Sequence, residues 1–141
     1  EVVHHWLPGL TEEEDEPIRR REMVCDFFLT STNAVTESGF LVNIDGIGNR
    51  VAAMIFGPKR VFVVTGINKI VKDVEEGIKR VKNVAAPLNA QRVKAKVPCA
   101  STGKCEECGS PHRICRVITI HERPPLRTEM RVYILNEKLG F

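Results

Sequence analysis

Four of the five cysteines lie between residues 99 and 115. Their spacing is Cys99-x5-Cys105-x2-Cys108-x6-Cys115, so a close pair is flanked by two more distant thiols. Four thiolates in one loop can bind a tetrahedral zinc ion, and four cysteines also bind a [4Fe–4S] cluster. The softness of the sulfur ligands does not choose between them. A redox-active pair at Cys105 and Cys108, or cysteines that only pack, are the alternatives.

Two glycine-containing loops are candidates for binding an anion. Residues 43–50 join a predicted strand to a predicted helix, where backbone N–H groups can approach a phosphate or carboxylate. The loop lacks the third glycine of the dinucleotide fingerprint, because Val51 occupies that place. Residues 66–69 follow another predicted strand. The alternative for the first loop is a tight turn that needs its two glycines, and the alternative for the second is a loop with a solvated lysine. The candidate ligand-binding residues are Asn43, Asp45, Gly46, Gly48, Asn49, Arg50, Gly66, Asn68 and Lys69.

We expect these two loops to lie together at the carboxyl ends of strands, where ligands bind in open α/β sheets. Arg50 or Lys69 would then hold a sulfate, phosphate or carboxylate, and Gly48→Val would abolish that binding. The chain has no nucleophile elbow, P-loop or zinc-protease helix. Catalytic residues are therefore not assigned, and whether the chain is an enzyme stays open.

Apolar runs and helical patterns predict the elements that position these residues. Residues 24–30 and 60–65 lack alternation, so we expect neighbouring or near-neighbouring central strands that are buried on both faces. Residues 31–39 are polar and predict a turn region, and residues 97–115 predict an irregular cysteine loop. The order of elements predicts an α/β fold with a mostly parallel sheet. The further predicted elements are strands at 40–44, 116–121 and 131–136 and helices at 49–56 and 73–86, the second bent or restarted by Pro87.

Composition and charge narrow the class of protein. The 141 residues, 43% of them hydrophobic, suffice for one domain, which we divide into an N-terminal segment 1–22 and an α/β domain 23–141. Residues 59–96 carry ten basic and three acidic side chains, but aromatic residues do not interleave with them, so we expect no nucleic-acid partner. No apolar run is long enough for a membrane span, and no secretory signal opens the chain. We expect a cytoplasmic protein with reduced cysteines.

Several motifs resemble those of the lactate-utilisation (LUD) domain family, and the similarity covers nearly the whole chain from residue 23. The cysteine loop is similar to that of a cysteine-bearing branch of the family. The motifs are DFFLT at 26–30, NAVTESG at 33–39, LVNIDGIGNRVAA at 41–53, GPK at 57–59, GINK at 66–69, APLNA at 86–90, VYILNE at 132–137 and LGF at 139–141.

The resemblance implies a Rossmann-like three-layer α/β sandwich, similar to glucosamine-phosphate deaminase, ribose-phosphate isomerase and CoA transferases. It also implies an accessory role in oxidising lactate to pyruvate, beside iron–sulfur protein subunits. The family's N-terminal helix, strand and Gly-Gly-Ser type loop have no counterpart here, so we expect that part of the fold to be lacking. The alternative is an enzyme or binding domain for a small anionic metabolite such as a sugar phosphate, folate or CoA-like molecule. Self-association into a homo-oligomer is a further expectation.

Overall fold

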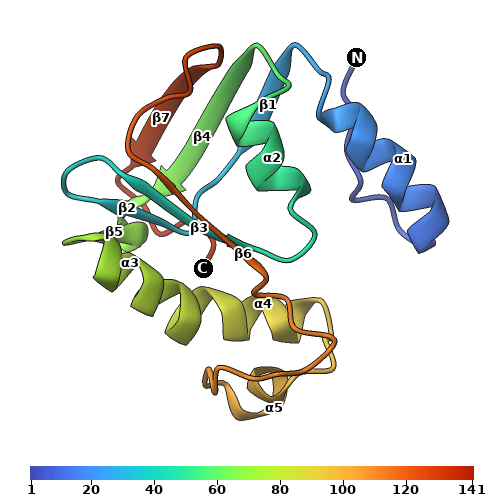
Figure 1. Cartoon of the computed structure of the whole chain (residues 1–141), viewed down its shortest axis with the longest axis vertical. Helices are drawn as coiled ribbons and strands as arrows, with labels where there is room; N and C mark the ends of the chain where they lie inside the picture. The colour runs from blue at the N-terminus through green and yellow to red at the C-terminus, as the bar shows by residue number, and fades with distance from the viewer.

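The computed structural model describes all residues 1–141 and contains two β-sheets flanked by helices (Figure 1). The strands run in the order β1-β4-β7 in a three-stranded sheet and β5-β2-β3-β6 in a four-stranded sheet. The strands are β1 (Phe27–Thr30), β2 (Ala34–Thr36), β3 (Leu41–Asp45), β4 (Arg60–Gly66), β5 (Ile70–Val71), β6 (Val117–His121) and β7 (Glu129–Leu135). The helices are α1 (Glu12–Glu22), α2 (Asn49–Ile55), α3 (Val74–Arg80), α4 (Ala86–Arg92) and α5 (Pro98–Thr102), with a 3-10 turn η1 (Ile67–Lys69) and a π-helical segment η2 (Val81–Ala85).

The two sheets differ in the direction of their strands. β4 pairs in parallel with β1 on one side and with β7 on the other. β3 pairs antiparallel with β2 and β6, while β2 and β5 are parallel. Residues 24–30 and 60–65 are thus neighbouring strands, as predicted, and the sheet that they form is parallel. Only β4 is central, however, because β1 lies at the edge of that sheet.

The elements stack in layers: the three-stranded sheet, the four-stranded sheet, and a rod of α3, η2 and α4 (Figure 1). A hydrophobic core between the sheets joins Val35 and Leu41 to Met54, Val61 and Val63. On the other side of the four-stranded sheet, Ile44 packs against the rod. The chain thus has the predicted α/β class and a Rossmann-like sandwich architecture.

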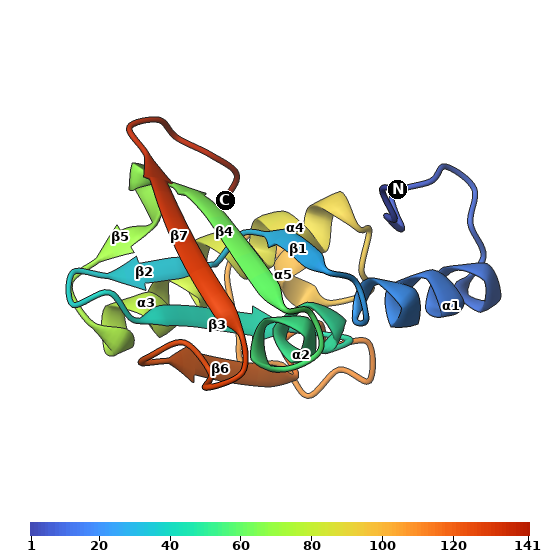
Figure 2. The same cartoon turned by 90° about the horizontal axis from the view of Figure 1, so that it is seen from above.

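Burial of the first strand on both faces was a wrong expectation. Phe27 and Leu29 of β1 are 55% and 73% exposed, and only the opposite face packs against the core. No helix covers this outer side of the three-stranded sheet in Figure 1 or Figure 2. The lack of alternation misled the prediction, because Phe27 stacks on Phe62 across the exposed face instead of entering a core. In β4 the inward residues are buried and the outward ones are mostly half-buried.

The polar segment 31–39 contains the short buried strand β2 and is not only a turn region. Three residues are too few to show a periodic pattern, and pairing with β3 and β5 decides their conformation. The helix predicted over 73–86 begins as expected, with Asp73 capping it by accepting a hydrogen bond from the Glu76 N–H. It continues to Arg92, since the π-helical segment widens the helix just before Pro87 and the proline lies in the first turn of α4.

The remaining predicted elements are present with small shifts of their ends. Residues 40–44, 116–121 and 131–136 correspond to β3, β6 and β7, and residues 49–56 correspond to α2. The cysteine loop contains one short helix, α5, and is otherwise irregular. No helix of the chain combines the length and the apolar character that crossing a membrane requires.

Candidate functional site

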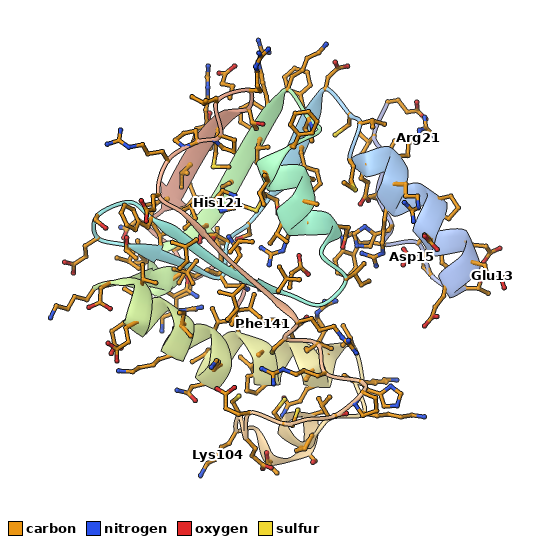
Figure 3. All side chains as sticks on the ribbon, viewed as in Figure 1. Glu13, Asp15, Arg21, Lys104, His121 and Phe141 are labelled. Carbon is orange, nitrogen blue, oxygen red and sulfur yellow. The ribbon has the colours of Figure 1, made fainter.

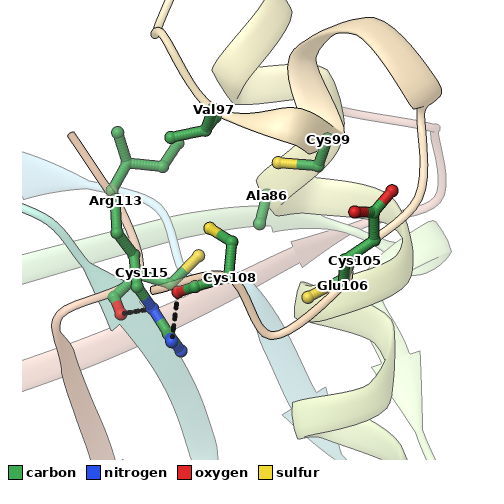
Figure 4. A pocket seen from close by; sticks show the side chains of 9 residues that line it. Ala86, Val97, Cys99, Cys105, Glu106, Cys108, Arg113 and Cys115 are labelled. Atoms are coloured by element: carbon green, nitrogen blue, oxygen red, sulfur yellow. Dashed lines mark hydrogen bonds between the residues drawn. The ribbon is translucent and has the colours of Figure 1, made fainter. Parts of the chain in front are cut away.

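The four clustered cysteines line one pocket beside the end of the helical rod (Figure 4). Cys99 lies on α5, Cys105 and Cys108 lie in the following turn, and Cys115 lies just before β6. The pocket has a volume of about 20 Å³. Its other walls come from Ala86, Val97, Glu106, Arg113 and Ile114.

Packing against α4 fixes one side of this pocket. Cys99 is buried in a small core with Ala90 and Val97, and Cys108 and Ile114 pack against that core. Pro98 begins α5, and Gly103 ends it in the left-handed conformation at φ 70°, which glycine adopts without a steric penalty. The chain can therefore reverse its direction directly after α5, which brings Cys105 and Cys108 close to Cys99.

Arg113 holds the two halves of the loop together. Its Nε donates a hydrogen bond to the Cys115 carbonyl at 2.7 Å, and its Nη1 donates to the Cys108 carbonyl at 3.0 Å (Figure 4). Its Nη2 lies 3.5 Å from the Glu107 carboxylate, which also pairs with Lys82 of the rod. The turn that carries Cys108 is thus tied both to the segment before β6 and to the helical layer.

The thiols influence one another electrostatically. Burial raises the pKa of Cys99, and the neighbouring Cys105 and Cys108 raise it further. Burial also raises the pKa of Cys115, with Cys105 adding to the increase and Arg113 opposing it. All four cysteines are free. A cation among them would relieve the mutual repulsion of the thiolates.

The shared pocket meets the expectation of convergent sulfurs only in part. No three of the His, Cys, Asp or Glu side chains stand in a geometry that ligates a metal ion. His112, the only histidine of the loop, is exposed and does not line the pocket. The four sulfur donors are nevertheless the set that a soft tetrahedral ion prefers.

The loop from Asn43 to Arg50 is placed at the carboxyl end of β3, as predicted. Gly48 precedes α2 with φ 95°, which explains the glycine there, and Asn49 is the first residue of that helix. The Asp45 carboxylate accepts hydrogen bonds from the N–H groups of Gly46 and Val51. A carboxylate of the chain itself therefore occupies the place expected for a bound anion.

Arg50 directs its donors to the chain itself. It donates to the backbone carbonyls of Ser31 and Ile44 and to the side-chain oxygens of Asn33 and Asn43. Its Nε also lies 3.5 Å from the Asp45 carboxylate. These contacts clamp the segment that leads from β1 to β2, which gives Arg50 a structural role.

Lys69 approaches the same segment from the second predicted loop. Its Nζ donates to the Ser31 hydroxyl and the Thr32 carbonyl, both at 3.2 Å, and no carboxylate lies within ion-pair distance. The residue is 5% exposed. Burial lowers the pKa of Lys69 to about 8, and the charges of Arg80 and Arg50 contribute. The structure thus brings the side chains of the two predicted loops together, and anion binding there stays a prediction.

The C-terminal residues cover the loop of Gly66 and Asn68. The Asn68 amide donates to the Gly140 carbonyl and accepts from the Leu139 N–H. A β-carbon on Gly66 would lie 2.3 Å from the Glu137 carbonyl oxygen, so only glycine allows the two backbones to approach this closely. Both residues therefore hold the end of the chain.

Sequence reasoning missed a polar group on the inward face of the four-stranded sheet. His121 is buried with both ring nitrogens unpartnered, and Thr119 Oγ1 and Asn43 Nδ2 also lack partners. Asn43 and Thr119 are cross-strand partners, and His121 pairs with Leu41 of the intersheet core. Burial lowers the pKa of His121, and the charge of Arg50 lowers it further. Alternation of Thr119 and His121 with isoleucines was the signal in the sequence.

The fold and pocket define an α/β domain with a cluster of four free cysteines. Residues 1–135 match the model of the LUD domain, and the chain belongs to this family. At the level of the family, membership associates the chain with lactate utilisation. No curated protein is detectably similar in sequence. Among solved structures, the chain is similar to a DUF162 family protein from Deinococcus radiodurans, with 18% identity, a TM-score of 0.46, and coverage of 94% of this chain and 72% of the other.

Proposed function

We propose that this chain is an accessory protein of lactate-to-pyruvate oxidation whose cysteine loop carries a metal centre. The observation that carries the proposal is the shared pocket of Cys99, Cys105, Cys108 and Cys115. Cysteines that only pack have no need to gather around one cavity. Membership of the LUD domain family supports the link to lactate.

The cysteine loop would act as the contact to an iron–sulfur subunit of a lactate-oxidising complex. The loop extends beyond both sheets, and Figure 3 places Lys104 at its far end. A bound metal would fix the fold of this loop, since the segment between α5 and β6 has little secondary structure of its own. In this role the chain's own residues position the loop, and the partner carries out the oxidation.

The first test is the metal content of protein purified without oxygen. We expect zinc or iron near one site per chain in the wild type and a large loss in Cys108→Ser. Cys25→Ser is the matched control, because the Cys25 thiol lies outside the pocket and donates to the Glu22 and Phe27 carbonyls. Wild-type protein without either metal, or equal metal in Cys108→Ser, would contradict the proposed centre.

The second test is physiological. Deleting the gene from its source organism should impair growth on lactate but not on glucose. The wild type and Cys25→Ser should restore growth, whereas Cys108→Ser should not. Unimpaired growth of the deletion strain on lactate would remove the proposed role, and full rescue by Cys108→Ser would separate that role from the cysteine loop.

A further inference from the structure

Three cations meet at residues 31–33, and the chain itself neutralises only one of them. Arg50, Lys69 and Arg80 all donate hydrogen bonds to this short segment. Arg50 lies 3.5 Å from the Asp45 carboxylate. Lys69 and Arg80 form no ion pair, and each of their hydrogen bonds is accepted by a hydroxyl or a backbone carbonyl. An anion bound beside them would offset the repulsion among these charges.

Lys69 keeps a donor for such an anion, whereas Arg50 uses its donors on the chain. The ammonium group has three N–H donors, and two of them are taken by the Ser31 hydroxyl and the Thr32 carbonyl. The Ser31 hydroxyl oxygen lies 3.4 Å from the Thr32 carbonyl oxygen, a long contact from which its proton can turn to a ligand. Lys69 and Ser31 therefore offer two donors at one point.

We propose that Lys69 and the Ser31 hydroxyl bind the carboxylate group of a small organic acid. The two donors match the two oxygens of a carboxylate, whereas a phosphate group has more oxygens to satisfy. The site lies apart from the cysteine loop, so the inference does not rest on the proposed metal centre.

The position of the two side chains in the fold suits a ligand. Ser31 directly follows β1, and Lys69 lies three residues beyond the end of β4. These two strands are parallel neighbours, and ligands of open α/β sheets bind outside the carboxyl ends of such strands. Ser31 is half-buried, so solvent reaches the site past its hydroxyl group.

Gly140 leaves space beside the ammonium group. A β-carbon on this residue would lie 3.4 Å from Lys69 Nζ. Asn68 anchors this part of the chain, because its amide donates to the Gly140 carbonyl and accepts from the Leu139 N–H. The backbone thus borders the site without placing a side chain in it.

The charge of Lys69 makes this binding depend on pH. Without a ligand its pKa is about 8, lowered by burial and by Arg80 and Arg50. Both arginines stay charged, and His121 is neutral at pH 7 and above because burial and Arg50 lower its pKa. A carboxylate ligand stays ionised throughout, so the affinity should fall about tenfold between pH 7 and pH 9.

Titration of the wild-type chain with sodium lactate, pyruvate and acetate, followed by ligand-observed NMR, tests the site. Lactate is the first probe because the LUD domain family is associated with lactate utilisation. We expect one acid per chain at pH 7 and the weaker binding at pH 9. Lys69→Met should weaken binding about tenfold or more, Ser31→Ala should weaken it less, and Lys72→Met, at an exposed lysine, should leave it unchanged. The pH series is made on the wild-type chain, so it does not depend on whether a variant folds.

Failure of all three acids to bind would overturn the inference. Binding that Lys69→Met retains in full, or that is equal at pH 7 and pH 9, would overturn it as well. Tighter binding of inorganic phosphate that is lost in Lys69→Met would overturn the choice of a carboxylate. None of these outcomes alters the metal content of the cysteine loop, so the proposed function is tested separately.

Discussion

Lys69 carries a buried positive charge without a carboxylate partner, and the stability of the protein should therefore depend on its protonation. The pKa of Lys69 is lowered from 10.5 to about 8 by burial and by the charges of Arg80 and Arg50. Below pH 8 both the folded and the unfolded chain carry the proton, and the folded state bears the full cost of the buried charge. Between pH 8 and 10.5 only the unfolded chain binds the proton, so stability should rise with pH.

The size of this effect follows from the two pKa values. At about 1.36 kcal/mol for each unit of difference, the upper limit is about 3 kcal/mol. Water that reaches the ammonium group reduces it, and we expect a rise of about 1–2 kcal/mol between pH 7 and 10. Lys69→Met removes the titrating group and with it this part of the pH dependence, although it also loses hydrogen bonds to Ser31 and Thr32.

Urea unfolding at pH 7, 8, 9 and 10 measures the free energy of unfolding of each variant. The curve of the wild type should rise relative to that of Lys69→Met across this range. The matched control is Lys72→Met, which replaces an exposed lysine three residues further on and should leave the pH profile unchanged. Parallel profiles for the wild type and Lys69→Met would refute the reasoning.

Substitutions at three more positions test other parts of the structure. Gly66→Ala would place a β-carbon 2.3 Å from the Glu137 carbonyl oxygen and 2.5 Å from the Leu139 nitrogen, so we expect a loss of about 2–4 kcal/mol in urea unfolding and faster proteolysis of the C-terminus. Asp73→Ala should cost about 1 kcal/mol through loss of the cap of α3, and Asp73→Asn should cost little; equal losses would argue against capping. Arg50→Met should cost about 3 kcal/mol or more, because it removes four hydrogen bonds to buried or half-buried oxygens, and a loss below 1 kcal/mol would contradict the clamp.

The elements that sequence reasoning predicted correctly are those with strong local signals. The apolar run that forms β3 and the start of the helix at Asp73 are each readable from a few neighbouring residues. The exposed face of β1 is not readable in this way. Its apolar side chains look like a core strand, and only the arrangement of the sheets leaves Phe27 and Leu29 uncovered.

The same division holds for the candidate sites. The spacing of the four cysteines was enough to predict that they share one site, and the structure places them around one pocket. The spacing of residues did not indicate that Arg50 donates hydrogen bonds to oxygens of Ser31 and Asn33, because those contacts join residues 17 or more positions apart. Nor did it reveal Arg113, whose role depends on two backbone carbonyls brought to it by the turn of the loop.

The central claim is that four thiols of one loop hold a metal centre. Native mass spectrometry of anaerobically purified protein tests it most directly, since intact mass gives both the identity and the number of bound ions on each chain. We expect a bound zinc ion or iron centre in the wild type and in Cys25→Ser, and the metal-free mass in Cys108→Ser. A metal-free wild type, or the same bound mass in Cys108→Ser, would contradict the claim.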